Sequence, residues 1–206
     1  MRIPGGYLVA VEGIEAVGKN TQSLLLVKWL RRKEVKTTHM SFPDYETQIG
    51  KEIKSFLSGR ADYPKELQHL LFAANRWEKL DELESCLKAG EAIIVNRYTG
   101  SNLAYGRANG LDVDWLANLE KGMPRADLVL VLDASPRALV TRRPGSSKDA
   151  YERSSALQGK AQKAYRELAR RQGWKLIDAD GPVGDVQASV IKAVREAIER
   201  DRRKEL

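Results

Sequence analysis

The amino-acid sequence predicts an α/β fold in which helices cover both faces of a central parallel β-sheet. Short runs such as 7–11 and 128–132 are continuously apolar, which is typical of strands that are buried on both faces. Segments with apolar residues at helical spacing separate these runs. This alternation favours a parallel sheet, whose ligands bind at the carboxyl ends of the strands.

Five strands and several helices are expected along the chain. The expected strands cover residues 7–11, 37–42, 92–95, 127–132 and 174–178. The expected helices cover 21–32, 67–89 and 185–203, with helical segments between 95 and 127 and a first helical turn at Pro136. Pro64 and Gly90 flank the long amphipathic helix, as residues that commonly open and end helices do.

The composition excludes several classes of protein. The chain has 206 residues, of which 42% are hydrophobic and 31% charged, so it can bury a core and is not expected to be disordered. No apolar run approaches the roughly 18 residues of a membrane helix. One cysteine, Cys86, and two histidines leave no disulfide and no Cys/His metal cluster. We therefore expect one domain over 1–206, in the cytoplasm and without a membrane partner.

The positive charge is concentrated in one segment. Residues 137–171 contain ten basic and three acidic residues, which accounts for the whole net charge of +7. A nucleic-acid-binding protein would spread its basic residues more widely, so no nucleic-acid partner is expected. A local positive zone suits a small polyanion, and the alternative is a solvated basic helix.

A phosphate-binding loop follows the first expected strand. Gly13, Gly18 and Lys19 have the spacing G-x-x-x-x-G-K between a strand and a helix, which is the context of a P-loop. Glycines let backbone N–H groups converge on phosphate oxygens at a helix N-terminus. The residues expected to bind ATP are Gly13, Ile14, Glu15, Ala16, Val17, Gly18, Lys19, Asn20 and Thr21. The pattern therefore predicts the three-layer P-loop NTPase fold with a five-stranded parallel sheet.

Further motifs extend the comparison along the whole chain. They are VEGIE at 11–15, GKNTQ at 18–22, Phe42-Pro43, Ile49-Gly50, LLFAANRWE at 70–78, Asn96-Arg97-Tyr98 and DLVL at 127–130. In these motifs the chain resembles the thymidylate kinases, a family of P-loop nucleoside-monophosphate kinases. The resemblance implies transfer of the γ-phosphoryl group of ATP to dTMP, with Mg²⁺ as cofactor, and a homodimer.

Two residues of the LLFAANRWE motif are expected to recognise the acceptor base. Phe72 and Arg76 are four residues apart, so a ring and a guanidinium group project from one face of a helix. The resemblance implies that Phe72 stacks on thymine and that Arg76 donates to a carbonyl of the base. The alternatives are an ordinary core aromatic for Phe72 and a surface ion pair, for example with Glu78, for Arg76.

The resemblance assigns further residues to the acceptor sugar and phosphate. Arg97 would grip the phosphate, because its planar fork of donors suits an oxyanion, and Tyr45 would donate its hydroxyl there. Glu15 would bind the 3′-hydroxyl group, and Tyr105 would crowd the 2′ position, unless it is a packing residue. The full set expected to bind dTMP is Glu15, Phe42, Tyr45, Phe72, Arg76, Arg97, Ser101 and Tyr105.

Two amides stand at positions that matter for Mg²⁺. Asn20 replaces the usual Ser or Thr of the P-loop, and its oxygen is a hard neutral ligand that could hold the ion. Asn96 replaces the Asp that is usual before the motif arginine. Thr21 could also compensate for Asn20. We expect either weaker Mg²⁺ binding or more reliance on the ATP phosphates and Glu12.

Catalysis is expected to need a cation from a mobile lid over about 142–153. Relatives supply a transition-state cation from the P-loop or from the lid, and position 16 of this P-loop is the uncharged Ala16. Charge that spreads over the transferred phosphoryl group needs such a cation. The candidates are Arg153, Arg143 and Lys148, in that order, with Lys19 and Arg97 completing the catalytic set.

Three other functions remain open at this point. The first is a kinase of the same fold that acts on another nucleoside monophosphate or on a deoxynucleoside. The second is a P-loop regulator or a nucleic-acid-dependent ATPase. The third is a binding protein without activity, which the two amides Asn20 and Asn96 would permit.

Overall fold

Five parallel strands form one sheet in the order β2-β3-β1-β4-β5. The structure is a computed structural model that describes residues 5–142, 151 and 154–204. The strands are β1 (Tyr7–Glu12), β2 (Thr37–Ser41), β3 (Ala92–Asn96), β4 (Leu128–Asp133) and β5 (Lys175–Asp178). The expected α/β fold with a five-stranded parallel sheet is confirmed. The expected strands differ from the observed ones by one residue at one end, except β4, which differs by one residue at each end.

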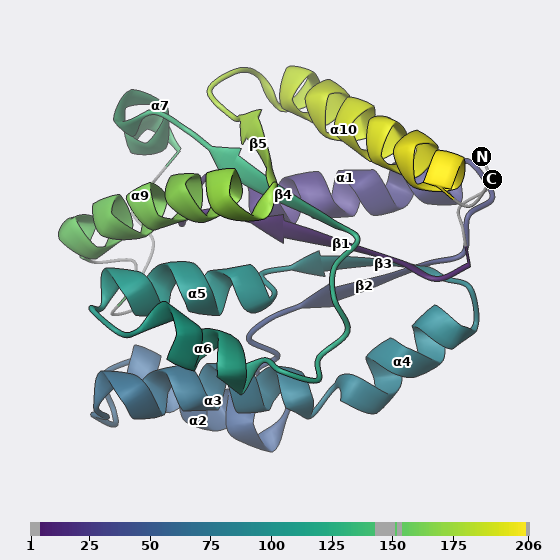
Figure 1. Cartoon of the computed structure of the whole chain (residues 1–206). Helices are drawn as coiled ribbons and strands as arrows, with labels where there is room; N and C mark the ends of the chain where they lie inside the picture. The colour runs from purple at the N-terminus through teal and green to yellow at the C-terminus, as the bar shows by residue number, and fades with distance from the viewer. Residues whose placement is uncertain (1–4, 143–150, 152–153, 205–206) are drawn as a thin grey trace.

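Helices cover both faces of the sheet (Figure 1). They are α1 (Lys19–Arg31), α2 (Gln48–Leu57), α3 (Lys65–Trp77), α4 (Leu80–Lys88), α5 (Thr99–Ala108), α6 (Val113–Leu119), α7 (Pro136–Thr141), α9 (Ser155–Gln172) and α10 (Val183–Lys204). The helices α1 and α10 pack on one face, and α4, α5 and α9 lie on the other. Among the described residues, no helix is apolar and long enough to cross a membrane.

The two faces of β1 are buried in different clusters. Val9 and Val11 pack with Leu26 of α1, whereas Leu8 and Ala10 pack with residues such as Leu83 of α4. Side chains alternate between the faces of a strand, so a strand covered on both sides has to be apolar at every position. This is why the run 7–11 shows no alternation.

One expected helix is two helices in the structure. The continuous helix expected over 67–89 is wrong, because α3 ends at Trp77 and α4 begins at Leu80. The two parts pack on different partners: α3 lies against α2 and α5, whereas α4 lies against β3. A single straight helix could not bury both apolar faces. Asp81 and Glu82 lie in the first turn of α4, where negative side chains are favourable. They indicate the beginning of a helix, which apolar periodicity alone does not show.

The helix α2 was not expected from the sequence. Thr47 caps it by accepting a hydrogen bond from the Gly50 backbone N–H. A Cβ atom at Gly50 would lie 1.7 Å from the Asp44 carbonyl oxygen, so only glycine permits this close approach. Ile53 and Phe56 on the inner face pack against residues of α3, which places α2 beside the carboxyl edge of the sheet.

A buried carboxylate joins the end of β1 to the beginning of α5. Glu12 is fully buried, and its Oε1 accepts hydrogen bonds from the backbone N–H groups of Tyr98 (2.8 Å) and Ser101 (3.1 Å). Its Oε2 accepts from the hydroxyl groups of Ser101 (2.6 Å) and Tyr165 (3.0 Å). A negative group is favourable at a helix N-terminus, so Glu12 acts as a long-range cap of α5.

We expect Glu12→Ala to lower the free energy of unfolding by about 3–5 kcal/mol, because it leaves buried donors without acceptors. Glu12→Gln should cost less, about 1–2 kcal/mol. The hydroxyl groups of Ser101 and Tyr165 can turn to accept from an amide, whereas backbone N–H groups cannot. Urea unfolding measures both values. The matched control is Glu84→Ala, which removes an exposed partner of Lys88; an effect of Glu12→Ala no larger than the control's would refute this role.

Candidate functional site

The P-loop turns sharply between β1 and α1. Gly13 and Gly18 have φ angles of 135° and 97°, and a Cβ atom at Gly13 would lie 2.5 Å from the Leu132 carbonyl oxygen. Ala16 also has a positive φ, of 64°. The Lys19 ammonium group donates to the Ile14 carbonyl oxygen at 2.7 Å. The loop therefore curls around the lysine at the amino end of α1, where an oxyanion is favoured.

A cavity of about 390 Å³ lies over this loop and has the size of a small-molecule site. P-loop residues from Glu15 onward line it, together with Gln22, Gly181 of the segment between β5 and α10, and Val183 and Val186 of α10. Arg142 holds that segment by donating to the carbonyl oxygens of Asp180 and Gly181, each at 3.1 Å. We call this the donor cavity.

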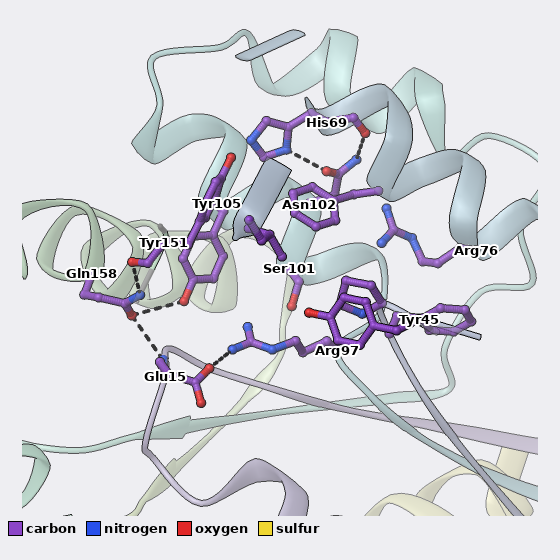
Figure 2. Close-up of a pocket in the computed structure, with 14 residues that line it drawn as sticks. Glu15, Tyr45, His69, Arg76, Arg97, Ser101, Asn102, Tyr105, Tyr151 and Gln158 are labelled. Atoms are coloured by element: carbon purple, nitrogen blue, oxygen red, sulfur yellow. Dashed lines mark hydrogen bonds and ion pairs between the residues drawn. The ribbon is translucent and has the colours of Figure 1, made fainter. Parts of the chain in front are cut away.

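A second cavity, the acceptor cavity, lies beside the first. All the residues expected to bind dTMP line it: Glu15, Phe42, Tyr45, Phe72, Arg76, Arg97, Ser101 and Tyr105. Figure 2 labels several of them, and shows Arg76, Arg97 and Tyr105 gathered around one cavity from different elements. The cavity volume is about 120 Å³.

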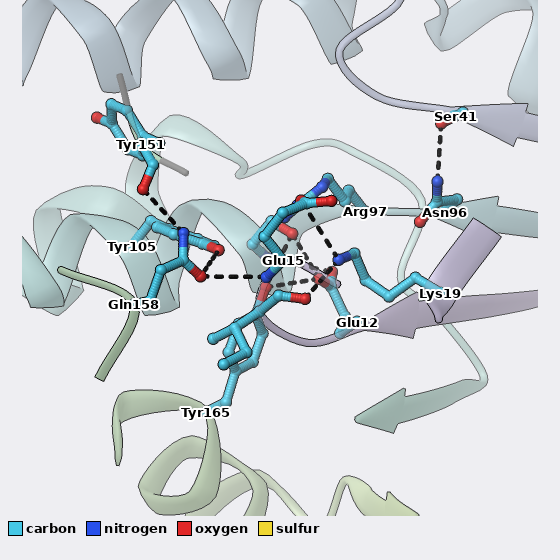
Figure 3. Close-up of polar contacts among 12 residues, drawn as sticks. Glu12, Glu15, Lys19, Ser41, Asn96, Arg97, Tyr105, Tyr151, Gln158 and Tyr165 are labelled. Atoms are coloured by element: carbon cyan, nitrogen blue, oxygen red, sulfur yellow. Dashed lines mark hydrogen bonds and ion pairs between the residues drawn. The ribbon is translucent and has the colours of Figure 1, made fainter. Parts of the chain in front are cut away.

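Glu15 and Arg97 line both cavities and form an ion pair with each other (Figure 3). Burial raises the pKa of Glu15, but the positive charges of Lys19 and Arg97 outweigh it and lower the pKa to about 2. Burial lowers the pKa of Arg97, but Tyr105 and Glu15 outweigh it and raise the pKa. Both groups are therefore charged at neutral pH, at the point where the cavities meet.

The backbone conformation of Arg97 aims its side chain at this point. Its φ angle is 62°, in the left-handed region, and its N–H donates to the Val11 carbonyl oxygen at 3.0 Å. The guanidinium carbon lies 5.8 Å from the centre of the Tyr105 ring. Such a backbone conformation costs energy and is kept only where the surroundings enforce it, here by the end of β1 on one side and α5 on the other.

Aromatic side chains form the far wall of the acceptor cavity. The Phe72 ring is half-buried and packs edge-on against the rings of Phe56 and Tyr151, with centres 5.5 and 5.9 Å apart. Phe42 is buried near the carboxyl end of β2, and Tyr45 lies 36% exposed at the mouth. Phe72 is thus more than an ordinary core residue, because part of its ring faces the cavity.

Arg76 does not form the surface ion pair that was one alternative for it. It is buried, and its Nε and Nη2 groups donate to the two carboxylate oxygens of Glu120, the former at 3.0 Å. Glu78 instead accepts from the Asn75 side chain at 3.1 Å. Arg76 therefore lies inside the acceptor cavity with a partner that the sequence did not identify.

Gln158 joins the two sides of the site. Its Oε1 accepts from the Glu15 backbone N–H and from the Tyr105 hydroxyl group, each at 3.1 Å, and its Nε2 donates to the Tyr151 carbonyl oxygen at 2.9 Å. Sequence reasoning missed Gln158, and also His69, Asn102 and Tyr151. No short motif marks Gln158, which lies in a helix rich in exposed charged residues.

The residues present fit a magnesium ion bound with the donor phosphates. Asn96 lines the donor cavity, and its Oδ1 is buried without a hydrogen-bond partner among the described residues, while its Nδ2 donates to Ser41. Asn20 lines the same cavity. Glu12 is not available as a ligand, because both of its oxygens accept hydrogen bonds. Within the described ranges, no group of three or more His, Cys, Asp or Glu residues could hold a metal by itself.

Most of the expected lid lies outside the described residues. Arg143, Lys148 and Arg153 belong to 143–150 and 152–153, of which nothing is described. Arg142 and Tyr151 are described, and they line the donor cavity and the acceptor cavity respectively. Sequence reasoning placed Arg142 only in the lid and assigned it no contact with the segment at 180–181.

Comparisons with known proteins agree with this geometry. The family model described as thymidylate kinase matches residues 11–190. Thymidylate kinase of Arabidopsis thaliana is 36% identical over 195 residues, which cover 95% of this chain and 73% of the relative. That of Plasmodium falciparum is 34% identical over 190 residues, covering 92% and 90%. The solved structure of thymidylate kinase from Candida albicans has a TM-score of 0.83 at 27% identity and covers 93% of this chain and 92% of its own. The chain belongs to the thymidylate kinase family.

Proposed function

We propose that the donor cavity binds ATP and that the acceptor cavity binds dTMP. The reaction of a thymidylate kinase transfers the γ-phosphoryl group of ATP to dTMP and forms ADP and dTDP. The observation that carries this assignment is the junction at Glu15 and Arg97, which line both cavities. Two nucleotides in these cavities would have their phosphates adjacent, as in-line transfer requires.

The charged groups at the junction would orient the phosphates. Lys19 would contact the terminal phosphates of ATP, and Arg97 would hold the acceptor phosphate with two parallel N–H groups. Glu15, ionised in the free protein, would then release Arg97 and accept a hydrogen bond from the 3′-hydroxyl group of the sugar. Phe72 would stack on the base while Arg76 donates to one of its carbonyl groups.

Magnesium would enter with ATP and neutralise part of the phosphate charge. Asn20 would be its protein ligand, and the unpartnered Oδ1 of Asn96 would accept from the water in its outer shell. Neutral amides attract a divalent cation less than carboxylates do. The phosphates themselves would therefore supply most of the attraction.

The chain would act as one domain over 1–206, whose lid, about 142–153, supplies the transition-state cation. Ala16 has no charge to offer, so Arg153 is the first candidate, followed by Arg143 and Lys148. A contact made only in the transition state raises kcat without tightening substrate binding.

A homodimer and a cytoplasmic location complete the proposal. Leu67, Leu70 and Trp77 of α3 are 38–43% exposed, and at helical spacing they form an apolar stripe on the outer face of that helix. An exposed stripe of this kind favours contact with another protein surface, here a second copy of the chain. The single cysteine, Cys86, is free, which agrees with a reducing compartment.

A panel of acceptors tests the function. We expect kcat/KM to be highest for dTMP and about 10-fold or more lower for dUMP, because one methyl group contributes about 1–3 kcal/mol. UMP should be poorer still, since Tyr105 crowds the 2′ position, and thymidine should not react. A coupled assay of ADP release measures these values. Phosphorylation of UMP or AMP at least as good as that of dTMP would contradict the assignment.

The lid assignment has its own test. Arg153→Ala should lower kcat by about 10²-fold or more with little change in the KM for dTMP. Adding Ala16→Arg to this variant should restore part of kcat, and the added side chain brings no new backbone strain, because Ala16 is already a non-glycine residue at positive φ. Steady-state kinetics gives both values, with exposed Arg171→Ala of α9 as the matched control. Full activity of Arg153→Ala, without a larger defect in Arg143→Ala or Lys148→Ala, would exclude a catalytic lid cation.

A further inference from the structure

Glu120 lies behind the acceptor cavity at the start of a chain of buried hydrogen bonds. It is 8% exposed. Its Oε2 accepts from the Nε group of Arg76 at 3.0 Å, and its Oε1 accepts from the Nη2 group of Arg76 and from the Asn102 amide at 2.8 Å. An ionised carboxylate can only accept hydrogen bonds. Glu120 therefore dictates which end of the Asn102 amide faces it.

The orientation of Asn102 determines the orientation of its neighbours. With its NH₂ group on Glu120, its Oδ1 faces His69 Nδ1 at 2.7 Å, so that nitrogen carries the ring proton. His69 Nε2 is then an acceptor for the Asn109 amide at 3.1 Å. The same amide donates to the Tyr151 hydroxyl group at 3.0 Å. The Asn102 NH₂ group also donates to the His69 carbonyl oxygen at 3.3 Å. The carboxylate of Glu120 and this carbonyl group together set the polarity of the chain from Asn102 to Tyr151.

Two features keep this polarity in place. Burial lowers the pKa of His69 to about 4, although the hydrogen bond to Asn102 opposes the shift, so the ring is neutral at physiological pH. At the other end, the Tyr151 hydroxyl group donates onward to Gln68 Oε1 at 2.8 Å. Each hydrogen bond of the chain pairs one donor with one acceptor. If one side chain turned over, its next neighbour would face it donor to donor or acceptor to acceptor.

Arg76 can present only donors to the cavity, and Glu120 determines which of them face it. A guanidinium group has five N–H groups, and Glu120 takes those on Nε and one on Nη2. Figure 2 shows the guanidinium group among the side chains of the cavity. The remaining N–H groups can bind a carbonyl oxygen, as in thymine, but they oppose the amino group of cytosine, which is itself a donor.

We propose that Glu120 is the positioning residue that sets the selectivity of the acceptor cavity for a base with a carbonyl group over one with an amino group. It acts through Arg76, which it orients with a hydrogen bond to each of its two carboxylate oxygens. This inference rests on the proposed function, because it requires that Arg76 contact the base of the acceptor.

The test is the isosteric change Glu120→Gln. Arg76 donates to both carboxylate oxygens, so the new NH₂ group faces a donor of Arg76 in either orientation. We expect the KM for dTMP to rise about 10-fold or more, because donors are then left unpaired. The kcat at saturation should change less than about 3-fold, and the preference for dTMP over dCMP in kcat/KM should fall about 10-fold or more. Glu84→Gln on the exposed face of α4 is the matched control and should change none of these values.

The change Glu120→Asp separates polarity from mere packing. Asp keeps an ionised carboxylate that only accepts hydrogen bonds, although it is one methylene group shorter, whereas Gln keeps the shape and loses the charge. Glu120→Asp should therefore keep at least about one third of the wild-type preference for dTMP over dCMP. Urea unfolding of each variant separates loss of fold from loss of recognition. If Glu120→Gln does not fold, Glu120→Asp decides alone, because the proposal requires that it fold and discriminate.

The outcomes distinguish this inference from the proposed function. Arg76→Met is measured in parallel. If it raises the KM for dTMP while Glu120→Gln leaves both the KM and the base preference unchanged, the role of Glu120 is overturned and the acceptor assignment stands. If Arg76→Met has no effect on dTMP, the acceptor assignment of this cavity fails. A folded Glu120→Asp variant that discriminates no better than Glu120→Gln overturns the polarity argument.

Discussion

The carboxylate of Glu12 ties the central strand of the sheet to the helix that carries much of the acceptor cavity. The P-loop begins directly after Glu12 in the chain. The carboxylate oxygens of Glu12 accept hydrogen bonds from the beginning of α5, the helix that follows Arg97. The N–H of Arg97 donates to the Val11 carbonyl oxygen, and the N–H of the next residue, Tyr98, donates to Glu12. These two contacts with the end of β1 hold the strained backbone of Arg97 in place. Arg97 and Glu15 line both cavities. The buried contact between Glu12 and α5 therefore keeps the donor cavity and the acceptor cavity in a fixed position relative to each other.

The fold could be predicted from the sequence wherever a local pattern has a single physical solution. A strand covered on both faces must be apolar throughout, as β1 is, and a P-loop requires glycine where Gly13 approaches Leu132. The break between α3 and α4 was missed because both helices share one apolar period, although each packs on a different partner. Such a break depends on tertiary packing, which periodicity does not contain.

The residues of the site also fall into two groups, those that could be predicted from the sequence and those that could not. Residues that a motif carries, such as Lys19 and Arg97, could be placed from the sequence, and the structure brings them to the junction of the two cavities. Glu120 and Gln158 could not, because their partners lie far away in the chain: Glu120 pairs with Arg76, and Gln158 binds the Glu15 backbone. A buried carboxylate or amide among polar residues looks like surface until the fold supplies its partner.

Native-state hydrogen exchange of the Tyr98 and Ser101 amides tests most directly the central claim, that Glu12 holds the two halves of the site together. Both N–H groups donate to Glu12 Oε1. The account predicts that they exchange only when the whole molecule unfolds, with an opening free energy equal to the one that urea unfolding gives. Exchange through a local opening that requires several kcal/mol less would contradict it, because the start of α5 could then detach from β1 while the rest stays folded.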